Sequence, residues 1–173
     1  VLGVVTSAAG VAMIIGSLMV SALPKPKDRV RVVYVTMLIS LGSENYILAF
    51  AREPIVWCIG QIIGWILVPV MSANLDVILR NVVPVDLQGR VYACRNTFQF
   101  FTIPIGFLLG GLLTDKVFEP FMNGSNSALL IALFGEGKGS GAAMLFFVMG
   151  IIGVLICLIF SWVLRKYNWS NKR

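Results

Sequence analysis

The stretch Ala142–Leu164, AAMLFFVMGIIGVLICLIFSWVL, decides the fold class of this chain, because no charged side chain interrupts it. An α-helix needs about 20 predominantly apolar residues to cross the hydrocarbon core of a bilayer. Four earlier stretches have a similar character. The sequence therefore predicts five membrane-spanning helices, at about residues 1–23, 32–50, 55–79, 91–114 and 142–164. We interpret residues 1–173 as a single transmembrane domain.

The composition also favours an all-α integral membrane protein. Hydrophobic residues make up 58% of the chain and charged residues 13%, whereas about a quarter of the residues of a soluble domain are charged. A transmembrane barrel would show strands of about 10 residues with alternating polarity. The apolar residues here are continuous within each span instead.

The connection at residues 115–141 is predicted to be an outer loop. Its apolar piece, 128–134, is too short to cross a bilayer, so we expect a short helix at the membrane interface. The glycine-rich segment 135–141 predicts a flexible hinge before the last span.

The basic residues predict the orientation of the spans. If the N-terminus faces outward, 11 of the 14 lysines and arginines lie on the cytoplasmic side, and Arg52, Lys116 and Lys138 lie outside. The cytoplasmic set is Lys25, Lys27, Arg29, Arg31, Arg80, Arg90, Arg95, Arg165, Lys166, Lys172 and Arg173. Short loops rich in Lys and Arg remain cytoplasmic, so we expect the C-terminus there. Orientation explains the net charge of +6 without a nucleic-acid partner.

Several classes of chemistry are disfavoured by the residues present. The chain has no histidine, the commonest metal ligand and near-neutral proton carrier. Its three cysteines lie inside or beside apolar stretches, which suits packing, and no Gly-x-x-x-x-Gly-Lys-Ser/Thr phosphate loop is present. We expect no enzymatic activity, no cofactor and no metal. The start at Val1, without a basic n-region, shows no signal peptide and suggests a piece of a longer protein.

Glu44 lies within the second predicted span. A carboxylate at the centre of a bilayer costs about 2.5–3.5 kcal/mol on insertion scales, so it normally faces a cavity or a partner. Two interpretations stay open. Glu44 either carries a proton or binds a substrate, or it lies near the outer interface and reaches the lipid headgroups.

The third predicted span has polar residues along one helical face. Steps of three and four residues keep such positions together, and the stripe consists of Gln61, Trp65, Pro69, Ser72, Asp76 and Arg80. Asp76 can pair with Arg80, four residues later, or with Arg95 of the next span. We favour a structural or gating role for this stripe over contact with a substrate.

The fourth predicted span repeats this pattern, with Arg95, Gln99 and Thr102 on one face and the spacing Gly106-x-x-x-Gly110-Gly111 after them. Small residues four apart allow two membrane helices to approach closely. Pro104 lies between the polar and the glycine halves and predicts a bend. We expect the glycines to serve helix packing.

The segment from Val83 to Val91, VPVDLQGRV, leads into Ile103-Pro104-Ile105-Gly106 and then into Leu113–Pro120, LTDKVFEP. These motifs resemble the C-terminal half of major facilitator superfamily exporters, and more narrowly the macrolide-efflux and enterobactin-exporter-like branch. The resemblance covers nearly the whole chain. It implies that the five spans correspond to helices 8–12 of a twelve-helix transporter, with helix 7 and the N-terminal half as missing partners.

The resemblance also implies a function: export of amphipathic drugs or metabolites such as macrolides, by alternating access driven by protons, across a bacterial cytoplasmic membrane. The expected partners are a small-molecule substrate, protons and the lipid bilayer. The candidate residues for the transport path or proton coupling are Glu44, Gln61, Asp76 and Gln99. The candidates for a gate or charge latch are Asp28, Arg29, Arg80, Gln88, Gly89, Arg90 and Arg95.

Two alternatives stay open. A non-transporting membrane sensor or assembly protein of the same fold would be favoured if the polar stripes of spans three and four met in a dry interface. A membrane-embedded enzyme would be favoured if Glu44, Asp76 and Arg95 surrounded one sealed pocket.

Overall fold

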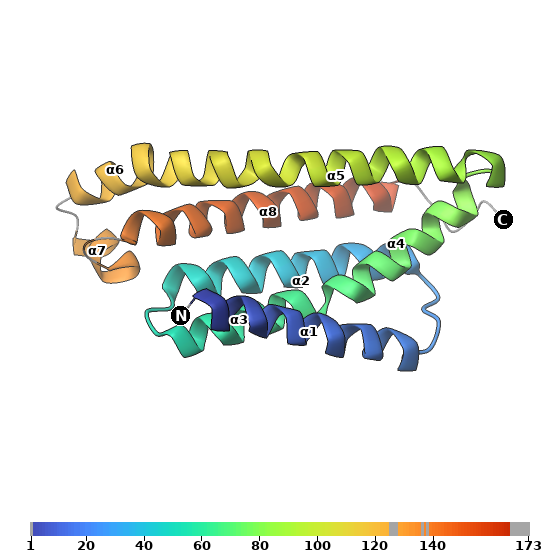
Figure 1. Cartoon of the computed structure of the whole chain (residues 1–173), viewed down its shortest axis with the longest axis horizontal. Coiled ribbons are helices and arrows are strands. Elements are labelled where there is room, and N and C mark those ends of the chain that lie inside the picture. The colour runs from blue at the N-terminus through green and yellow to red at the C-terminus, as the bar shows by residue number, and fades with distance from the viewer. Residues whose placement is uncertain (1, 125–127, 136, 138, 167–173) are drawn as a thin grey trace.

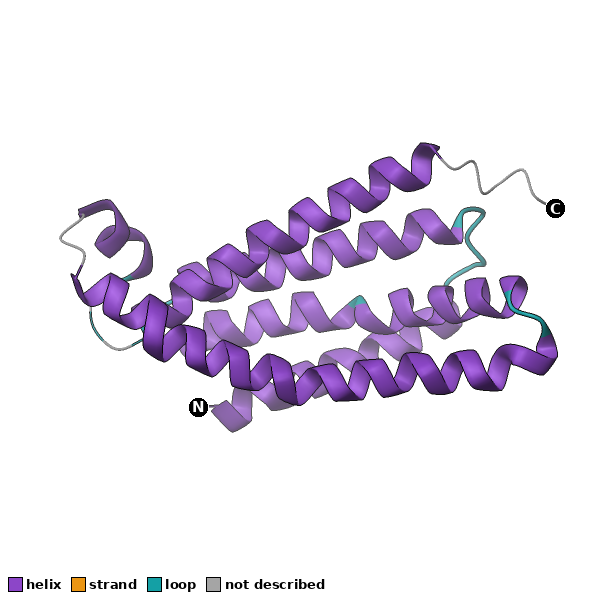
Figure 2. Ribbon diagram, turned by 90° about the horizontal axis from the view of Figure 1, so that it is seen from above, coloured by secondary structure: helices purple, strands orange, loops and turns teal. Residues whose placement is uncertain are grey.

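A computed structural model of the chain describes residues 2–124, 128–135, 137 and 139–166, and all its regular structure in these ranges is helical (Figures 1 and 2). The elements are α1 (Leu2–Ala22), α2 (Arg29–Phe50), α3 (Pro54–Ile66), α4 (Val68–Val82), α5 (Val85–Leu113), the π-helix η1 (Thr114–Phe118), α6 (Glu119–Gly124), α7 (Ala128–Phe134) and α8 (Ser140–Lys166). Residues 136 and 138 of the predicted hinge, including Lys138, lie outside the described residues, as do Lys172 and Arg173 of the charge count.

Within the described residues, five helical segments are long and apolar enough to cross a membrane, as the sequence predicted, and they indicate a multi-pass α-helical membrane protein. They run up and down side by side (Figure 1). The α1–α2 turn and the α4–α5 link lie at one end of the bundle. The α2–α3 link, α6, α7 and the start of α8 lie at the other (Figures 1 and 2).

The third span is two helices rather than one. Pro69 lacks a backbone N–H and its ring obstructs the preceding turn, so α3 ends at Ile66 and α4 begins at Val68 with the proline in its first turn. α1 packs over this break: a Cβ at Gly16 would overlap the Ile66 carbonyl oxygen and lie 3.1 Å from Pro69 Cγ. A glycine at this position therefore allows α1 to contact the backbone of the break.

α2 is the central helix and contacts α3, α4 and α8. Its packing against α8 depends on glycines. A Cβ at Gly150 would lie 3.1 Å from Asn45 Cβ, and one at Gly153 would lie 3.5 Å from Leu41 Cδ1. Small residues at such contacts let membrane helices approach closely, so α2 and α8 form a tightly packed pair.

The fourth span is longer than predicted. The helix beginning at Val85 continues through η1 and α6 to Gly124, a run of 40 residues, which is about 60 Å at 1.5 Å per residue. The bilayer core is about 30 Å thick. Residues 115–124, which the sequence predicts to be the start of the outer loop, are therefore helical. The reason is that charged residues such as Asp115 and Lys116 end an apolar stretch without ending a helix.

α5 is joined to the rest of the bundle at its two ends. All of α5 is described, and none of its side chains is buried. Its first turns contact α4, and the η1 segment that continues it contacts α8. At that second junction a Cβ on Gly141 would lie 2.5 Å from the Glu119 backbone nitrogen, and Glu119 Oε1 accepts a hydrogen bond of 2.7 Å from the Gly139 N–H.

The short predicted helix at 128–134 is present as α7 and covers the end of α2. Arg52 Nη2 donates a 2.7 Å hydrogen bond to the Ala132 carbonyl. The rings of Phe50, Phe134 and Phe147 contact one another, with centroids 5.5–6.1 Å apart. Aromatic contacts of this kind stabilise by about 0.5–1.5 kcal/mol each beyond their buried area. This aromatic cluster therefore fixes α7 to α2 and α8.

Candidate functional site

Two groups of polar residues within the spans are candidates for function. The first, here called the Glu44 cluster, consists of Ser40 and Glu44 on α2 and Gln61, Gly64 and Trp65 on α3. The second, the Asp76–Arg95 pair, joins α4 to α5 and includes Tyr92.

In the Glu44 cluster, the carboxylate of Glu44 points toward α3 and is half-buried. Trp65 Nε1 donates a hydrogen bond of 3.0 Å to Glu44 Oε1, and the Gln61 side chain lies beside the carboxylate one turn earlier. This position differs from the interpretation in which Glu44 reaches outward to lipid headgroups. Gln61 and Glu44, predicted as path residues, are thus brought together by the fold.

Gly64 makes this arrangement possible. A Cβ at that position would lie 2.5 Å from Glu44 Oε2 and 2.8 Å from Glu44 Cβ. The same residue receives a hydrogen bond from α2, because the buried hydroxyl of Ser40 donates to the Gly64 carbonyl at 2.6 Å. Ser40 and Glu44 are four residues apart, so both face α3 from one side of α2.

Glu44 has no cationic partner in the described part of the chain, where the ion pair between Asp76 and Arg95 is the single salt bridge. A carboxylate in a span without a countercharge is stabilised by hydrogen bonds, by protonation or by a bound cation. The Trp65 donor supplies one such hydrogen bond. Chemically, the site is therefore able to accept a proton or a cationic group of a ligand.

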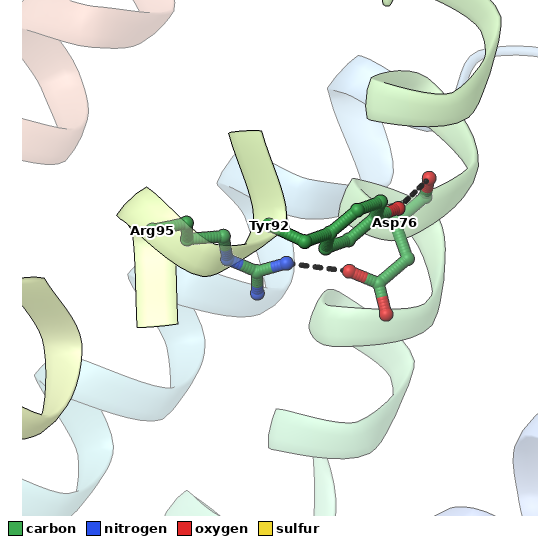
Figure 3. Close-up of polar contacts among 3 residues, drawn as sticks. All are labelled: Asp76, Tyr92 and Arg95. Atoms are coloured by element: carbon green, nitrogen blue, oxygen red, sulfur yellow. Dashed lines mark hydrogen bonds and ion pairs between the residues drawn. The ribbon is translucent and has the colours of Figure 1, made fainter. Parts of the chain in front are cut away.

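The Asp76–Arg95 pair connects α4 to α5, a helix with no buried side chain (Figure 3). Arg95 Nη1 lies 2.5 Å from Asp76 Oδ1, and the Tyr92 hydroxyl donates a 3.1 Å hydrogen bond to the Asp76 backbone carbonyl. The side chains are partly exposed, 29% for Arg95 and 42% for Asp76. Of the two partners considered for Asp76, the structure selects Arg95.

The remaining residues proposed for a gate have separate positions at the same end of the bundle. Asp28 is the N-cap of α2 and accepts a 3.0 Å hydrogen bond from the Arg31 N–H. Arg29 Nη1 donates to Asn74 Oδ1 at 3.1 Å, which ties the start of α2 to α4. These two residues therefore have structural partners and do not pair with each other.

The α4–α5 link is held by Gln88. Its side-chain amide donates to the Val83 carbonyl at 3.1 Å and to the Arg80 carbonyl at 3.2 Å. The side chains of Arg80 and Arg90 are exposed, and a Cβ on Gly89 would meet no heavy atom of the described chain within 4 Å. Gln88 thus shapes the corner, while the two arginines face outward.

The open face of α5 carries the other predicted residues. Gln99 is exposed. Apart from the adjacent residues and the backbone of α5 itself, no described heavy atom lies within 4 Å of a Cβ added at Gly106, Gly110 or Gly111. No helix among the described elements packs against these glycines, so their role in packing stays a prediction.

Four residues that take part in these contacts are not among the sequence-based candidates: Ser40, Gly64, Asn74 and Tyr92. Ser40 and Gly64 had a signal, since a serine four residues before Glu44 and a glycine beside Trp65 extend the two polar faces. Asn74 is a buried amide whose Nδ2 donates to the Val70 carbonyl at 2.8 Å. An asparagine in an apolar span is itself a signal, because such a group requires hydrogen-bond partners.

Comparisons with protein-family models, with curated proteins and with solved structures give no match for this chain. Among the described residues, no group of three or more Cys, Asp or Glu side chains is placed to hold a metal ion.

Proposed function

We propose that the chain is the C-terminal part of a secondary active transporter of the major facilitator type, which exports amphipathic compounds by alternating access in exchange for protons. The observation that carries the proposal is the Glu44 carboxylate, half-buried between α2 and α3 and hydrogen-bonded to Trp65. Ionisable residues inside membrane spans are rare and typically mark ion paths, substrate paths or proton relays.

The discontinuity of the third span supports this proposal. The gap between α3 and α4 at Leu67 follows three residues after Gly64, which contacts Glu44. Several transporter folds place their sites beside broken helices, because an interrupted helix exposes polar backbone groups to a ligand. In the proposed mechanism, Glu44 carries a proton or binds a cationic substrate beside this break.

The Asp76–Arg95 pair has a gating role in the proposal. It lies toward the end of the bundle that carries the basic turns, and the positive-inside rule favours a cytoplasmic position for that end. We propose accordingly that the chain resides in a bacterial cytoplasmic membrane with its C-terminus inside. The orientation can be tested by fusing to the C-terminus a reporter enzyme that is active only in the periplasm. Activity of this fusion would contradict a cytoplasmic C-terminus.

The two alternatives lack the observations that would favour them. A dry interface between the polar faces of spans three and four would favour a non-transporting protein, but Gln99 on α5 is exposed. One shared pocket around Glu44, Asp76 and Arg95 would favour an enzyme, but Glu44 bonds Trp65 while Asp76 pairs with Arg95.

The test is efflux from cells. The full-length gene is expressed in a host without its own pumps, and efflux of a macrolide and of a fluorescent cationic dye is measured with and without a protonophore. The proposal expects protonophore-sensitive efflux that Glu44→Gln abolishes and that Glu53→Gln, a change at an exposed carboxylate in the α2–α3 link, leaves intact. Equal efflux in both variants would remove Glu44 from the mechanism. Absence of efflux of every compound, from protein shown to be folded in the membrane, would contradict export of this class of substrate.

A further inference from the structure

The end of the bundle formed by the α1–α2 turn and the α4–α5 link carries an excess of exposed cations. Lys25, Lys27 and Arg31 are exposed around the turn, and Arg80 and Arg90 are exposed around the link. The turn and the link lie at the same end of the molecule (Figures 1 and 2). These five residues are called the basic end below.

The other charged residues of the turn already have partners. Asp28 caps α2 through the Arg31 backbone N–H, and Arg29 donates to Asn74. The acidic group is therefore directed at a helix N-terminus, where its charge is partly balanced. The side chains of Lys25, Lys27 and Arg31 remain on the surface.

The opposite end has a different charge balance. Of its described residues, the exposed or partly exposed charged ones are Arg52, Glu53, Asp115, Lys116 and Glu119, so acidic groups outnumber basic ones in this set. At the basic end, the described residues include five exposed cations and two exposed acidic residues, Asp28 and Asp86. Among the described side chains, the basic end is therefore the more positive of the two ends.

Apolar side chains adjoin these cations. Leu23 is 52% exposed immediately before the turn, and Val82 and Val85 are 58% and 84% exposed on either side of the link. A soluble anion would contact the cations alone. A phospholipid contacts cations with its headgroup and apolar side chains with its acyl chains, and clusters of four or more basic residues beside a membrane helix favour anionic headgroups.

We propose that the basic end binds the headgroups of anionic phospholipids, with Lys25, Lys27 and Arg31 as the principal contacts. The two prolines of the turn, Pro24 and Pro26, restrict its backbone, so little ordering is needed when a headgroup binds. This inference does not depend on the proposed transport activity, since it rests on charge, exposure and position in the bundle.

The test uses the full chain in mixed detergent micelles that contain a fluorophore-labelled phosphatidylglycerol. Unlabelled phosphatidylglycerol is expected to displace the probe, whereas phosphatidylcholine with the same acyl chains and glycerol phosphate without acyl chains are expected to displace it poorly. Each cation near an anionic membrane surface strengthens binding by roughly fivefold. Three such losses multiply, so the triple variant with Lys25→Gln, Lys27→Gln and Arg31→Gln should bind about a hundredfold more weakly.

The matched control is the double variant Arg52→Gln and Lys116→Gln at the opposite end, which should bind as the unchanged chain does. Equal loss in both variants, no loss in the triple variant, or displacement by phosphatidylcholine as effective as by phosphatidylglycerol would overturn the proposal. Displacement by glycerol phosphate at equal concentration would show a site for free phosphate esters instead. If the triple variant melts at a lower temperature, Lys25→Gln alone, at an exposed position in the turn, replaces it in the comparison.

Discussion

Replacing Gly16 by alanine is expected to loosen the contact between α1 and the break in the third span. The added Cβ would overlap the backbone carbonyl oxygen of Ile66, and it would lie 3.1 Å from the carbonyl carbon and 3.1 Å from Pro69 Cγ. Backbone atoms cannot rotate aside as a side chain can. α1 must therefore move outward, or the α3–α4 break must change its shape.

The size of the effect follows from two opposing terms. Overpacking by one methyl group costs about 1–3 kcal/mol, and a backbone obstacle places Gly16→Ala in the upper part of this range. Alanine in the middle of a helix gains about 0.5–1 kcal/mol over glycine. The net expectation is a loss of about 1–2 kcal/mol in the free energy of unfolding.

Gly10 on the same helix provides the control. No heavy atom of the described chain lies within 4 Å of a Cβ added there, so Gly10→Ala is expected to be neutral or to stabilise by up to about 1 kcal/mol. Both variants are purified in mild detergent and unfolded by sodium dodecyl sulfate, with helix content followed by circular dichroism. Equal stability of the two variants would refute the close contact between α1 and Ile66.

Three further predictions concern the two junctions that join α5 and its continuation to the rest of the bundle. Asp76→Asn and Arg95→Gln should each lower the free energy of unfolding, and the double variant should lose less than the sum of the two. The same unfolding assay, used in a double-mutant cycle, should give a coupling energy of about 1 kcal/mol. Strict additivity would mean that the ion pair contributes nothing. Gly141→Ala should lower the free energy of unfolding by about 1–3 kcal/mol, because its Cβ would lie 2.5 Å from the Glu119 backbone nitrogen. Gly106→Ala is the control and should be tolerated. The melting temperatures of the two variants test the difference. Glu119→Gln keeps an acceptor but loses the negative charge beside the first turn of α8, and should lower stability by about 0.3–1 kcal/mol, less at high salt; a loss that does not respond to salt would argue against the electrostatic cause.

The number of spans was predictable because it depends on apolar length alone. The ends of the fourth span were not, because hydropathy reports where a helix leaves the bilayer and not where it ends. Asp115 and Lys116 stop the apolar stretch, yet the helix continues past them through η1 to Gly124. The break in the third span had a visible cause in Pro69, but a proline in a membrane helix produces either a bend or a break, and the choice depends on what packs there.

The sequence indicated which residues belong to the candidate site better than it indicated which of them contact each other. Helical periodicity placed Gln61, Trp65 and Asp76 on one face of the third span. Whether Asp76 meets Arg80 or Arg95 depends on how α4 and α5 approach each other, which no local pattern specifies. The contact of Glu44 with Trp65 depends in the same way on the approach of α2 to α3, which a glycine at position 64 permits.

Two kinds of contact between helices can be compared here, and they differ in the free energy needed to separate the helices. α1 meets the third span, and α2 meets α8, through glycines that bring backbone or Cβ atoms into direct contact. Separating these helices exposes a fitted surface over several turns. Near its start α5 meets α4 through one ion pair, the Tyr92 hydroxyl and the Gln88 corner. Partly exposed ion pairs contribute about 0–1 kcal/mol, so separating α5 from α4 costs less free energy than separating the helices joined by glycine contacts.

If the bundle changes shape during the proposed transport cycle, we therefore expect α5 to move first. It would turn about its junction with α8, because there Gly141 contacts the backbone and η1 departs from regular α-helical hydrogen bonding.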